Sequence, residues 1–290
     1  MQYIEAKSIL SKLRTNDPYF GISYNMNLYR GCQHACIYCD TRSECYGIND
    51  ISNISVKSNA LELLTKELRT KRKARATIGT GSMNDPYMPL EKELEITRQA
   101  LQIIASEKFT VHVITKSDLI TRDADILQDI AKIYAAASFT ITTYDDNIAK
   151  TIEPFAPKSS DRFKAMERLS SLGIYTGVTL MPVLPFINDT RENIENIMKK
   201  AKDSGASYVI FMPGMTLRKG SREYFYNSLV HCFPGIKERY QSTFGEQYIC
   251  NSPNYKILMD TFYDLSAKLN IETRMIFYQP ITNHQLNIWE

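Results

Sequence analysis

The chain has 290 residues, of which 43% are hydrophobic and 23% charged, and its formal net charge is +3. This composition is typical of a soluble globular protein with a sizeable core, and it excludes a disordered chain and a minimal scaffold. The small net charge does not by itself indicate a nucleic-acid partner. Residues 1–10 lack the features of a signal peptide and no apolar segment reaches membrane-spanning length, so we expect a cytoplasmic protein.

Strand-like and helix-like segments alternate along most of the chain. We expect residues 1–20 to be irregular and 20–28 to form a first strand that leads into a cysteine-rich loop. Runs of β-branched and aromatic residues predict further strands at 75–80, 109–115, 137–143, 174–181 and 207–211. Apolar residues at helical spacing predict helices between them, at 58–73, 90–106, 121–135, 161–171 and 191–203.

Six strands that alternate with helices predict a parallel α/β sheet, open or curled into a barrel. The alternation stops after residue 212, where we expect helices near 221–231 and 254–269 and a last strand at 274–278. The predicted parts are an N-terminal extension (1–21), the βα unit (22–212) and a C-terminal segment covering the barrel (213–290). Active sites gather at the C-terminal ends of parallel strands, so one mouth should unite 32–39, 79–82, Lys116, 140–143 and Met181-Pro182.

Three cysteines, Cys32, Cys36 and Cys39, lie within eight residues, close enough for one loop to wrap three thiolates around a metal centre. Thiolates suit zinc and iron–sulfur centres, and structural sites of both kinds normally use four protein ligands. Three ligands would leave one iron of a cubane open to a non-protein ligand. The alternative is a zinc site completed by Cys45 or His34, or a redox-inert cluster, that only stabilises a nucleic-acid-binding module.

The Cys-x3-Cys-x2-Cys pattern, with Tyr38 before the last cysteine and a six-fold βα series around it, resembles the radical S-adenosylmethionine superfamily. Further motifs over roughly residues 22–212 resemble its spore-photoproduct-lyase-like branch. In chain order they are Asn27-x-Tyr29-Arg30-Gly31-Cys32, Asn84-Asp85-Pro86-Tyr87, Ile114-Thr115-Lys116-Ser117, Glu153-Pro154 followed by Pro157, and Pro182-x2-Pro185 with Asn188-Asp189.

This resemblance implies a partial (βα)6 TIM-like barrel that binds a [4Fe-4S] cluster through Cys32, Cys36 and Cys39, together with S-adenosylmethionine. By analogy, the methionine amino and carboxylate groups would occupy the open iron. Reduction by a flavodoxin- or ferredoxin-like donor would then yield a 5′-deoxyadenosyl radical that abstracts hydrogen from a substrate. Tyr38 would lie beside the adenine. The substrate is not specified, and DNA or RNA are candidates.

Other segments offer groups to S-adenosylmethionine. Lys116, at the end of the third strand, could pair with its carboxylate. Thr140 and Thr142 face one side of the fourth strand by the period of two and could hydrogen-bond the ribose or the methionine part. A glycine-rich turn permits close backbone approach and offers carbonyls and a hydroxyl to the amino group: Gly79, Thr80, Gly81 and Ser82.

One departure from the family bears on the substrate. Spore photoproduct lyases are expected to carry a hydrogen-donating cysteine in the loop after the second strand, whereas this chain has Ser82 and no cysteine from Thr77 to Pro89. A hydroxyl cannot readily replace a thiol because its O–H bond is much stronger. We therefore predict that the protein is not itself a spore photoproduct lyase and assign no catalytic residue. The remaining thiols could serve only if folding brings one to the site: Cys45, Cys232 and Cys250.

Several features have both a functional and an ordinary explanation. The basic run at 66–75 would suit a phosphate backbone, although a solvated helix end is the more usual explanation for such a run. His112 alternates with its valine neighbours and is expected to be a hydrogen-bonded strand histidine. Cys232 and Cys250 are expected to be two core thiols and not a second cluster. Five C-terminal tyrosines could stack on bases, although packing is the usual role of such residues: Tyr224, Tyr226, Tyr240, Tyr248 and Tyr255.

Overall fold

The computed structural model describes residues 1–14, 17–48, 50–71 and 76–279. Its centre is a seven-stranded sheet in the order β10-β9-β8-β7-β6-β3-β2. Six of these strands are parallel: β3 (Tyr24–Met26), β6 (Thr77–Thr80), β7 (Thr110–Thr115), β8 (Ala135–Thr140), β9 (Tyr175–Leu180) and β10 (Tyr208–Phe211). The structure therefore confirms the predicted α/β fold with six parallel strands.

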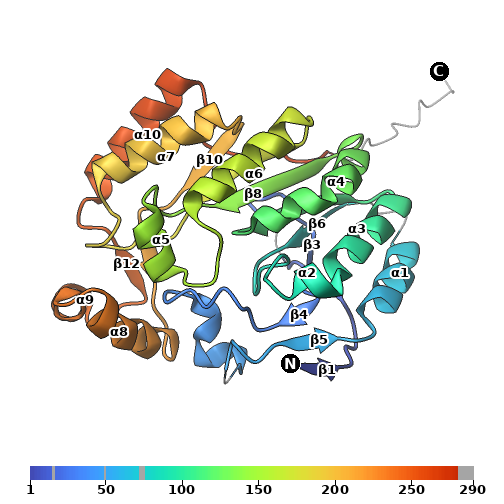
Figure 1. Ribbon diagram of the computed structural model, residues 1–290, viewed down its shortest axis with the longest axis horizontal. Helices are drawn as coiled ribbons and strands as arrows, with labels where there is room; N and C mark the ends of the chain where they lie inside the picture. The colour runs from blue at the N-terminus through green and yellow to red at the C-terminus, as the bar shows by residue number, and fades with distance from the viewer. Residues whose placement is uncertain (15–16, 49, 72–75, 280–290) are drawn as a thin grey trace, which may run out of the picture.

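Helices cover the outer face of this curved sheet in an arc (Figure 1). Their buried apolar residues recur at helical spacing, as with Leu64 and Leu68 of α1, and face outward-pointing strand residues such as Val111 and Val113. The main hydrophobic core thus lies between sheet and helices. The covering helices are α1 (Ala60–Thr70), α3 (Ile96–Ser106), α4 (Ala124–Ala131), α6 (Ser159–Ser171) and α7 (Arg191–Asp203), with α10 (Tyr255–Leu269) packed on α7.

The inner face of the sheet is more polar. His112 points inward between two outward valines, and its Nε2 lies 2.7 Å from Ser138 Oγ, which confirms the expected hydrogen-bonded strand histidine. Ser138 Oγ lies 2.6 Å from the Tyr208 hydroxyl. Aromatic side chains, including Phe20 and Phe277, pack around Tyr208. They fill the interior at the N-terminal end of the strands.

The N-terminal residues are not irregular, so this prediction was wrong. Strand β2 (Leu10–Lys12) pairs antiparallel with β3. A second sheet joins β1 (Gln2–Ile4), β5 (Ser55–Lys57) and β4 (Tyr29–Arg30). These strands have two or three residues each, which is too short for an alternating pattern to reveal them. The expected first strand at 20–28 is shortened to β3, and Gly21, whose φ is 61°, lies outside it.

Two predicted helices also begin differently. The expected helix at 90–106 is divided into α2 (Glu91–Leu94) and α3 because Glu95 has a φ of 52°. The expected helix at 121–135 begins as a 3-10 segment, Asp118–Asp123, ahead of α4. A further helix, α5 (Asp146–Ile152), was not predicted because it is short.

The C-terminal segment contains a hairpin of β11 (Gly214–Thr216) and β12 (Ile249–Asn251), together with α8 (Ser221–Cys232) and α9 (Ile236–Phe244). This part packs beside the cysteine loop (Figure 1). The predicted last strand at 274–278 was wrong, because Glu272 already bridges to β10 and the following residues cross the aromatic end of the interior. Among the described residues, no helix is long and apolar enough to cross a membrane.

Candidate functional site

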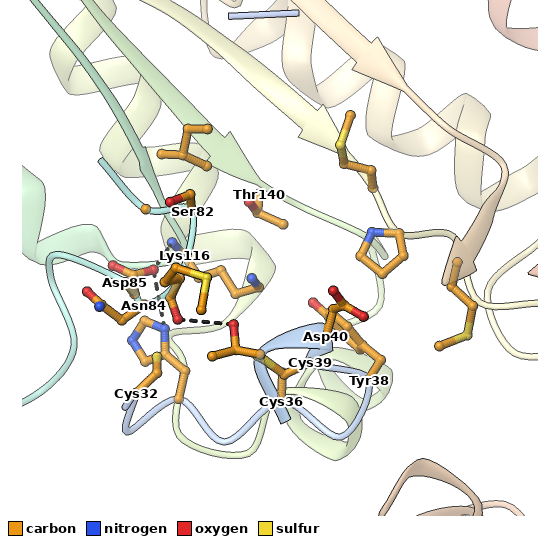
Figure 2. A pocket seen from close by; sticks show the side chains of 18 of the residues that line it. Cys32, Cys36, Tyr38, Cys39, Asp40, Ser82, Asn84, Asp85, Lys116 and Thr140 are labelled. Atoms are coloured by element: carbon orange, nitrogen blue, oxygen red, sulfur yellow. Dashed lines mark hydrogen bonds and ion pairs between the residues drawn. The ribbon is translucent and has the colours of Figure 1, made fainter. Parts of the chain in front are cut away.

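A cavity of about 300 Å³ opens at the C-terminal ends of the parallel strands. This volume is at the lower end of the range for ligand pockets. The wall combines the cysteine loop, the residues that follow β6, β7 and β9, the end of β8, and the start of the C-terminal segment (Figure 2). The structure thus unites at one mouth the cysteines, Lys116, Thr140 and Met181-Pro182.

The cysteine loop is fixed to the fold by main-chain hydrogen bonds. The Cys32 N–H donates to the Ile51 carbonyl at 2.8 Å, and the Ile37 N–H donates to the Ile152 carbonyl at 2.9 Å. A 3-10 turn, Asp40–Arg42, follows the last cysteine. The loop is therefore held at both ends before any ligand binds.

Cys32, Cys36 and Cys39 are free and all line the cavity. Burial raises the pKa of Cys32 to about 11 and that of Cys36 further, so these two thiols are protonated at neutral pH in the unliganded protein. A bound metal would have to displace these protons.

Zinc and an iron–sulfur cubane place different demands on these three thiols. Among the described residues, no three histidine, cysteine, aspartate or glutamate side chains are placed to hold a single metal ion. Zinc needs all its ligands about 2.0–2.3 Å from one ion. The thiolates of an iron–sulfur cubane instead bind different iron atoms around its edge. Three thiolates on one cavity wall are a donor set that a cubane with one open iron would take.

Asp85 connects the cysteine loop to the end of β7. Its Oδ2 lies 3.3 Å from Nδ1 of the buried His34 and accepts the Lys116 N–H at 2.7 Å. Its Oδ1 accepts the Thr115 hydroxyl at 2.6 Å and the Tyr87 N–H at 2.9 Å. Burial acts to raise the pKa of Asp85, but His34 and the hydrogen bonds outweigh it and hold this pKa well below its usual value. Asp85 is therefore ionised and holds the cysteine loop and the end of β7 together.

A buried ion pair supports Tyr38. The Tyr38 hydroxyl donates to the carboxylate of Glu153, whose Oε2 lies 2.5 Å from Nη2 of Arg162. Arg162, on α6, also donates to the Thr140 carbonyl at 2.8 Å. Burial acts to raise the pKa of Glu153, but the positive charges of Arg162 and Lys116 lower it overall. The same pair thus positions two residues of the cavity wall on different elements.

Lys116 enters the cavity from the end of β7. Its Nζ lies 5.8 Å from the centre of the Tyr38 ring, and its side chain extends toward the cysteine loop (Figure 2). Burial acts to lower the pKa of Lys116, but the nearby Cys36, Glu153 and Asp85 raise it overall. The ammonium group is therefore charged and available to a carboxylate ligand.

The predicted glycine-rich turn contributes only in part. Gly81 and Ser82 line the cavity, whereas Gly79 and Thr80 do not. Gly81 has a φ of 92°, and a Cβ there would lie 2.2 Å from the Ile114 carbonyl oxygen. At Gly79 a Cβ would instead meet the Ile22 side chain. One glycine thus permits the turn into the site, and the other permits packing within the barrel.

Of the two threonines predicted to contact the cosubstrate, only one lines the cavity. Thr140 lines the cavity, and its Oγ1 lies 2.9 Å from Thr179 Oγ1. Thr142 does not line it; its carbonyl accepts the side-chain amides of Asn188 and Asn193. The period of two fails here because β8 ends at Thr140.

The sequence did not indicate that Asp40 belongs to the site, whose wall also includes residues 214–216 of the C-terminal segment. Asp40 accepts the Tyr46 hydroxyl at 3.2 Å and lies 3.8 Å from Arg218 Nε. Its place directly after the last cysteine was a signal that could have drawn attention to it. Contacts across 178 positions, such as Asp40 to Arg218, leave no local pattern. Four methionines also line the cavity: Met83, Met181, Met212 and Met215.

The other cysteines lie away from the cavity wall. Cys45 is exposed, and its Sγ lies 3.6 Å from Arg218 Nη1. Cys250 is buried as expected, but Cys232 is exposed on α8, so the prediction of a core thiol was wrong for Cys232. None of these three cysteines lines the cavity, so none of them takes the place of the hydrogen-donating thiol that is missing at Ser82.

The basic run at 66–75 lies at a solvated helix end, and the C-terminal tyrosines include both buried and exposed side chains. In the described part of the run, Arg69 pairs with Glu107 at 3.2 Å and Lys71 lies 4.0 Å from Glu67, as expected for a solvated helix end. Arg72, Lys73 and Arg75 lie outside the described residues. Tyr226 and Tyr240 are buried, whereas three tyrosines are exposed: Tyr224, Tyr248 and Tyr255.

Comparisons with solved structures support the fold. The chain superimposes on a spore photoproduct lyase variant bound to a dinucleoside spore photoproduct with a TM-score of 0.69 at 12% identity, covering 92% of this chain and 78% of that one. A second variant, bound to S-adenosylmethionine and the dinucleoside photoproduct, gives a TM-score of 0.67 at 13% identity with the same coverage.

Sequence relatives extend over most of the chain. An uncharacterised protein of Methanocaldococcus jannaschii is 29% identical over 88% of this chain and 90% of its own. A radical SAM Nalpha-GlyT isomerase of Pseudomonas phage M6 is 23% identical over 71% of this chain and 40% of its own. The model of the Radical SAM superfamily matches residues 26–201, more than half of the chain. The chain therefore belongs to the radical S-adenosylmethionine superfamily of enzymes.

Proposed function

We propose that Cys32, Cys36 and Cys39 hold a [4Fe-4S] cluster and that the enzyme cleaves S-adenosylmethionine reductively to act on a substrate by radical chemistry. When bound, the cluster would supply the electron that breaks the S–C5′ bond and so yields a 5′-deoxyadenosyl radical. The observation that carries this proposal is the convergence of three cysteines, Tyr38 and Lys116 on one cavity at the strand ends.

The chain's own residues would bind and orient the cosubstrate. Lys116 presents a charged ammonium to the methionine carboxylate, and Gly81 lets the backbone after β6 approach closely. Ser82, held by a 2.6 Å hydrogen bond from the Asn25 amide, offers a hydroxyl, as does Thr140. Tyr38 would contact the adenine. Gly79, Thr80 and Thr142 would act indirectly, through the backbone that carries the lining residues.

The substrate would enter between the cysteine loop and the C-terminal segment. The four methionines form a polarizable, adaptable wall suited to an apolar or aromatic group. Near the end of the cysteine loop, Arg218 lies 4.8 Å from the Tyr248 ring centre and 5.8 Å from that of Tyr46, and Arg42 lies 3.6 Å from that of Tyr224. Arginine beside tyrosine suits phosphate and base contacts, so we propose DNA or RNA as the first substrate class to test.

Ser82, in the loop after the second parallel strand, favours a reaction other than that of spore photoproduct lyase. Ser82 lines the cavity at this loop, and the cysteines that line the cavity are those of the cluster motif, Cys32, Cys36 and Cys39. Hydrogen return to a product radical would then have to come from another source, such as 5′-deoxyadenosine itself or an external thiol.

Anaerobic reconstitution followed by dithionite and S-adenosylmethionine tests the proposal. We expect about four iron and four sulfide per chain, and release of 5′-deoxyadenosine and methionine. Cys36→Ala should abolish cluster assembly while leaving the fold largely intact. A colourless protein with one zinc and no acid-labile sulfide would instead favour the zinc-stabilised binding module. Assays with DNA, RNA and peptide extracts would then identify the substrate class.

A further inference from the structure

Asp40 follows the last cysteine of the loop directly and lines the cavity. Figure 2 shows its carboxylate projecting into the cavity on the opposite side from Asp85 and Ser82. Among the described residues, the two carboxylates that line this cavity are Asp40 and Asp85. The oxygens of Asp85 already face His34 and three protein donors. Asp40 is therefore the carboxylate of the cavity wall that is left for a ligand.

The Asp40 carboxylate is held in place, but its oxygens are not saturated. The Ser43 hydroxyl lies 3.1 Å from Oδ1, and the Tyr46 hydroxyl donates to Oδ2 at 3.2 Å. Arg218 Nε lies 3.8 Å from Oδ1, which is beyond hydrogen-bond distance, and Arg218 Nη2 donates to the Tyr248 hydroxyl at 2.7 Å. A carboxylate oxygen can accept two hydrogen bonds. Each oxygen of Asp40 therefore keeps one acceptor position for a ligand.

This carboxylate limits which part of a nucleic acid suits the cavity. A carboxylate repels phosphate, so a phosphate group is the wrong partner for Asp40. A base is a better one, because its edge carries N–H donors and its flat ring suits the methionines of the wall. The group that meets Asp40 in a nucleic-acid substrate is therefore a base.

The bases differ in the donors along their Watson–Crick edges. Thymine and uracil offer one N–H between two carbonyl oxygens, which a carboxylate repels. Adenine and cytosine offer one amino group beside an unprotonated ring nitrogen. Guanine offers two adjacent donors, N1–H and the 2-amino group, one for each oxygen of a carboxylate. Guanine is therefore the base whose edge complements the two open acceptor positions of Asp40.

We propose that Asp40 is a specificity-determining residue, which accepts hydrogen bonds from N1–H and the 2-amino group of a guanine in the substrate. The guanine would then lie in the cavity beside the cosubstrate, and the phosphates would stay outside it. Asp40 binds and orients the base in this arrangement and takes no part in bond breaking. The inference rests on the proposed function and names the base on which the enzyme would act.

The test compares two bases that differ in one group. Hypoxanthine keeps the ring, the O6 carbonyl and the N1–H of guanine but lacks the 2-amino group. Calorimetry is done with the reconstituted protein and S-adenosylmethionine, without reductant, and with the deoxydinucleotides d(GpG), d(IpI) and d(TpT). We expect d(GpG) to bind at least about tenfold more tightly than either of the others.

Asp40→Asn should reduce the preference for d(GpG) over d(IpI) to about twofold or less, because an amide has one acceptor oxygen and turns an NH2 group toward the donors of guanine. Iron content and the affinity for S-adenosylmethionine should stay unchanged. Glu44→Gln is the control: it removes the same charge four positions along, at an exposed carboxylate that pairs with Lys219 and does not line the cavity. This variant should keep the preference for d(GpG).

Equal affinity for d(GpG) and d(IpI) in the unaltered protein, or no binding of any dinucleotide, would overturn the assignment without any variant. An equal loss of preference in Glu44→Gln would overturn it too. Weaker binding of S-adenosylmethionine in Asp40→Asn would show that Asp40 contacts the cosubstrate instead. If dithionite drives no cleavage of S-adenosylmethionine, the proposed function fails, and the calorimetry still decides whether Asp40 selects guanine.

Discussion

Asp85 Oδ2 lies 3.3 Å from His34 Nδ1, and the same oxygen accepts the N–H of Lys116. One buried carboxylate thus fixes the distance between the cysteine loop and the strand end that carries the cavity's lysine. The two parts come from segments more than eighty residues apart, and neither can shift without breaking a contact to Asp85.

Asp85→Asn should weaken both fold and cluster assembly. An amide offers only one acceptor oxygen and would turn its NH2 group toward either the Lys116 N–H or the Thr115 hydroxyl, both of which are donors. We expect a loss of about 1–3 kcal/mol in the free energy of unfolding, measured by urea denaturation, and a lower iron content after reconstitution. Asp264→Asn, on the exposed side of α10, serves as the control. Full stability and iron content in Asp85→Asn would contradict the role of Asp85.

Gly81→Ala should damage the site more than an alanine at another left-handed glycine. Gly81 and Gly173 both have positive φ, but a Cβ at Gly81 would lie 2.2 Å from the Ile114 carbonyl oxygen, whereas Gly173 has nothing within 4 Å. Gly173→Ala should cost only the conformational strain, about 1 kcal/mol. Gly81→Ala must also move backbone next to Lys116. We expect a larger loss of stability and weak binding of S-adenosylmethionine in calorimetry, and similar behaviour of both variants would argue against this explanation.

Lys116→Met should weaken S-adenosylmethionine binding without preventing cluster assembly. The substitution removes the ammonium but keeps the N–H that donates to Asp85. We expect a loss of about ten- to a hundredfold in affinity, or about 1.4–2.7 kcal/mol, in calorimetry with the reconstituted protein. Lys116→Arg, which keeps the charge, should lose less. Unchanged affinity in Lys116→Met would show that another group binds the carboxylate.

The sequence predicted what depends on local pattern. The five longer parallel strands and most covering helices followed from periodicity, and the cysteine spacing led to the metal centre that we propose. The two-residue alternation correctly turned His112 inward but failed for Thr142, because no pattern marks the end of β8 at Thr140. The Tyr38–Glu153–Arg162 support could not be predicted, because buried polar contacts depend on how distant segments pack. Asp40 and Arg218 meet for the same reason.

Cys45→Ser should leave the metal centre intact. Cys45 is exposed, does not line the cavity, and contacts Arg218 at the surface. We expect unchanged iron and sulfide content and an unchanged visible absorption spectrum after reconstitution, in contrast to Cys36→Ala. Loss of the metal centre in Cys45→Ser would identify Cys45 as a fourth ligand and would revive the zinc alternative.

His112 should make stability fall as the pH drops below neutrality. Burial lowers the pKa of His112 to about 3, whereas an unfolded histidine has a pKa of about 6.5. Between these values the unfolded state binds a proton that the folded state does not, so the free energy of unfolding decreases as pH falls, by at most about 1.4 kcal/mol per pH unit. His112→Gln removes this titration. Urea denaturation of the metal-free protein between pH 7.5 and 5.5 should therefore give a flatter pH dependence for His112→Gln, whatever its stability at pH 7.5. Parallel curves would mean that His112 is already solvated, and therefore free to protonate, in the folded protein.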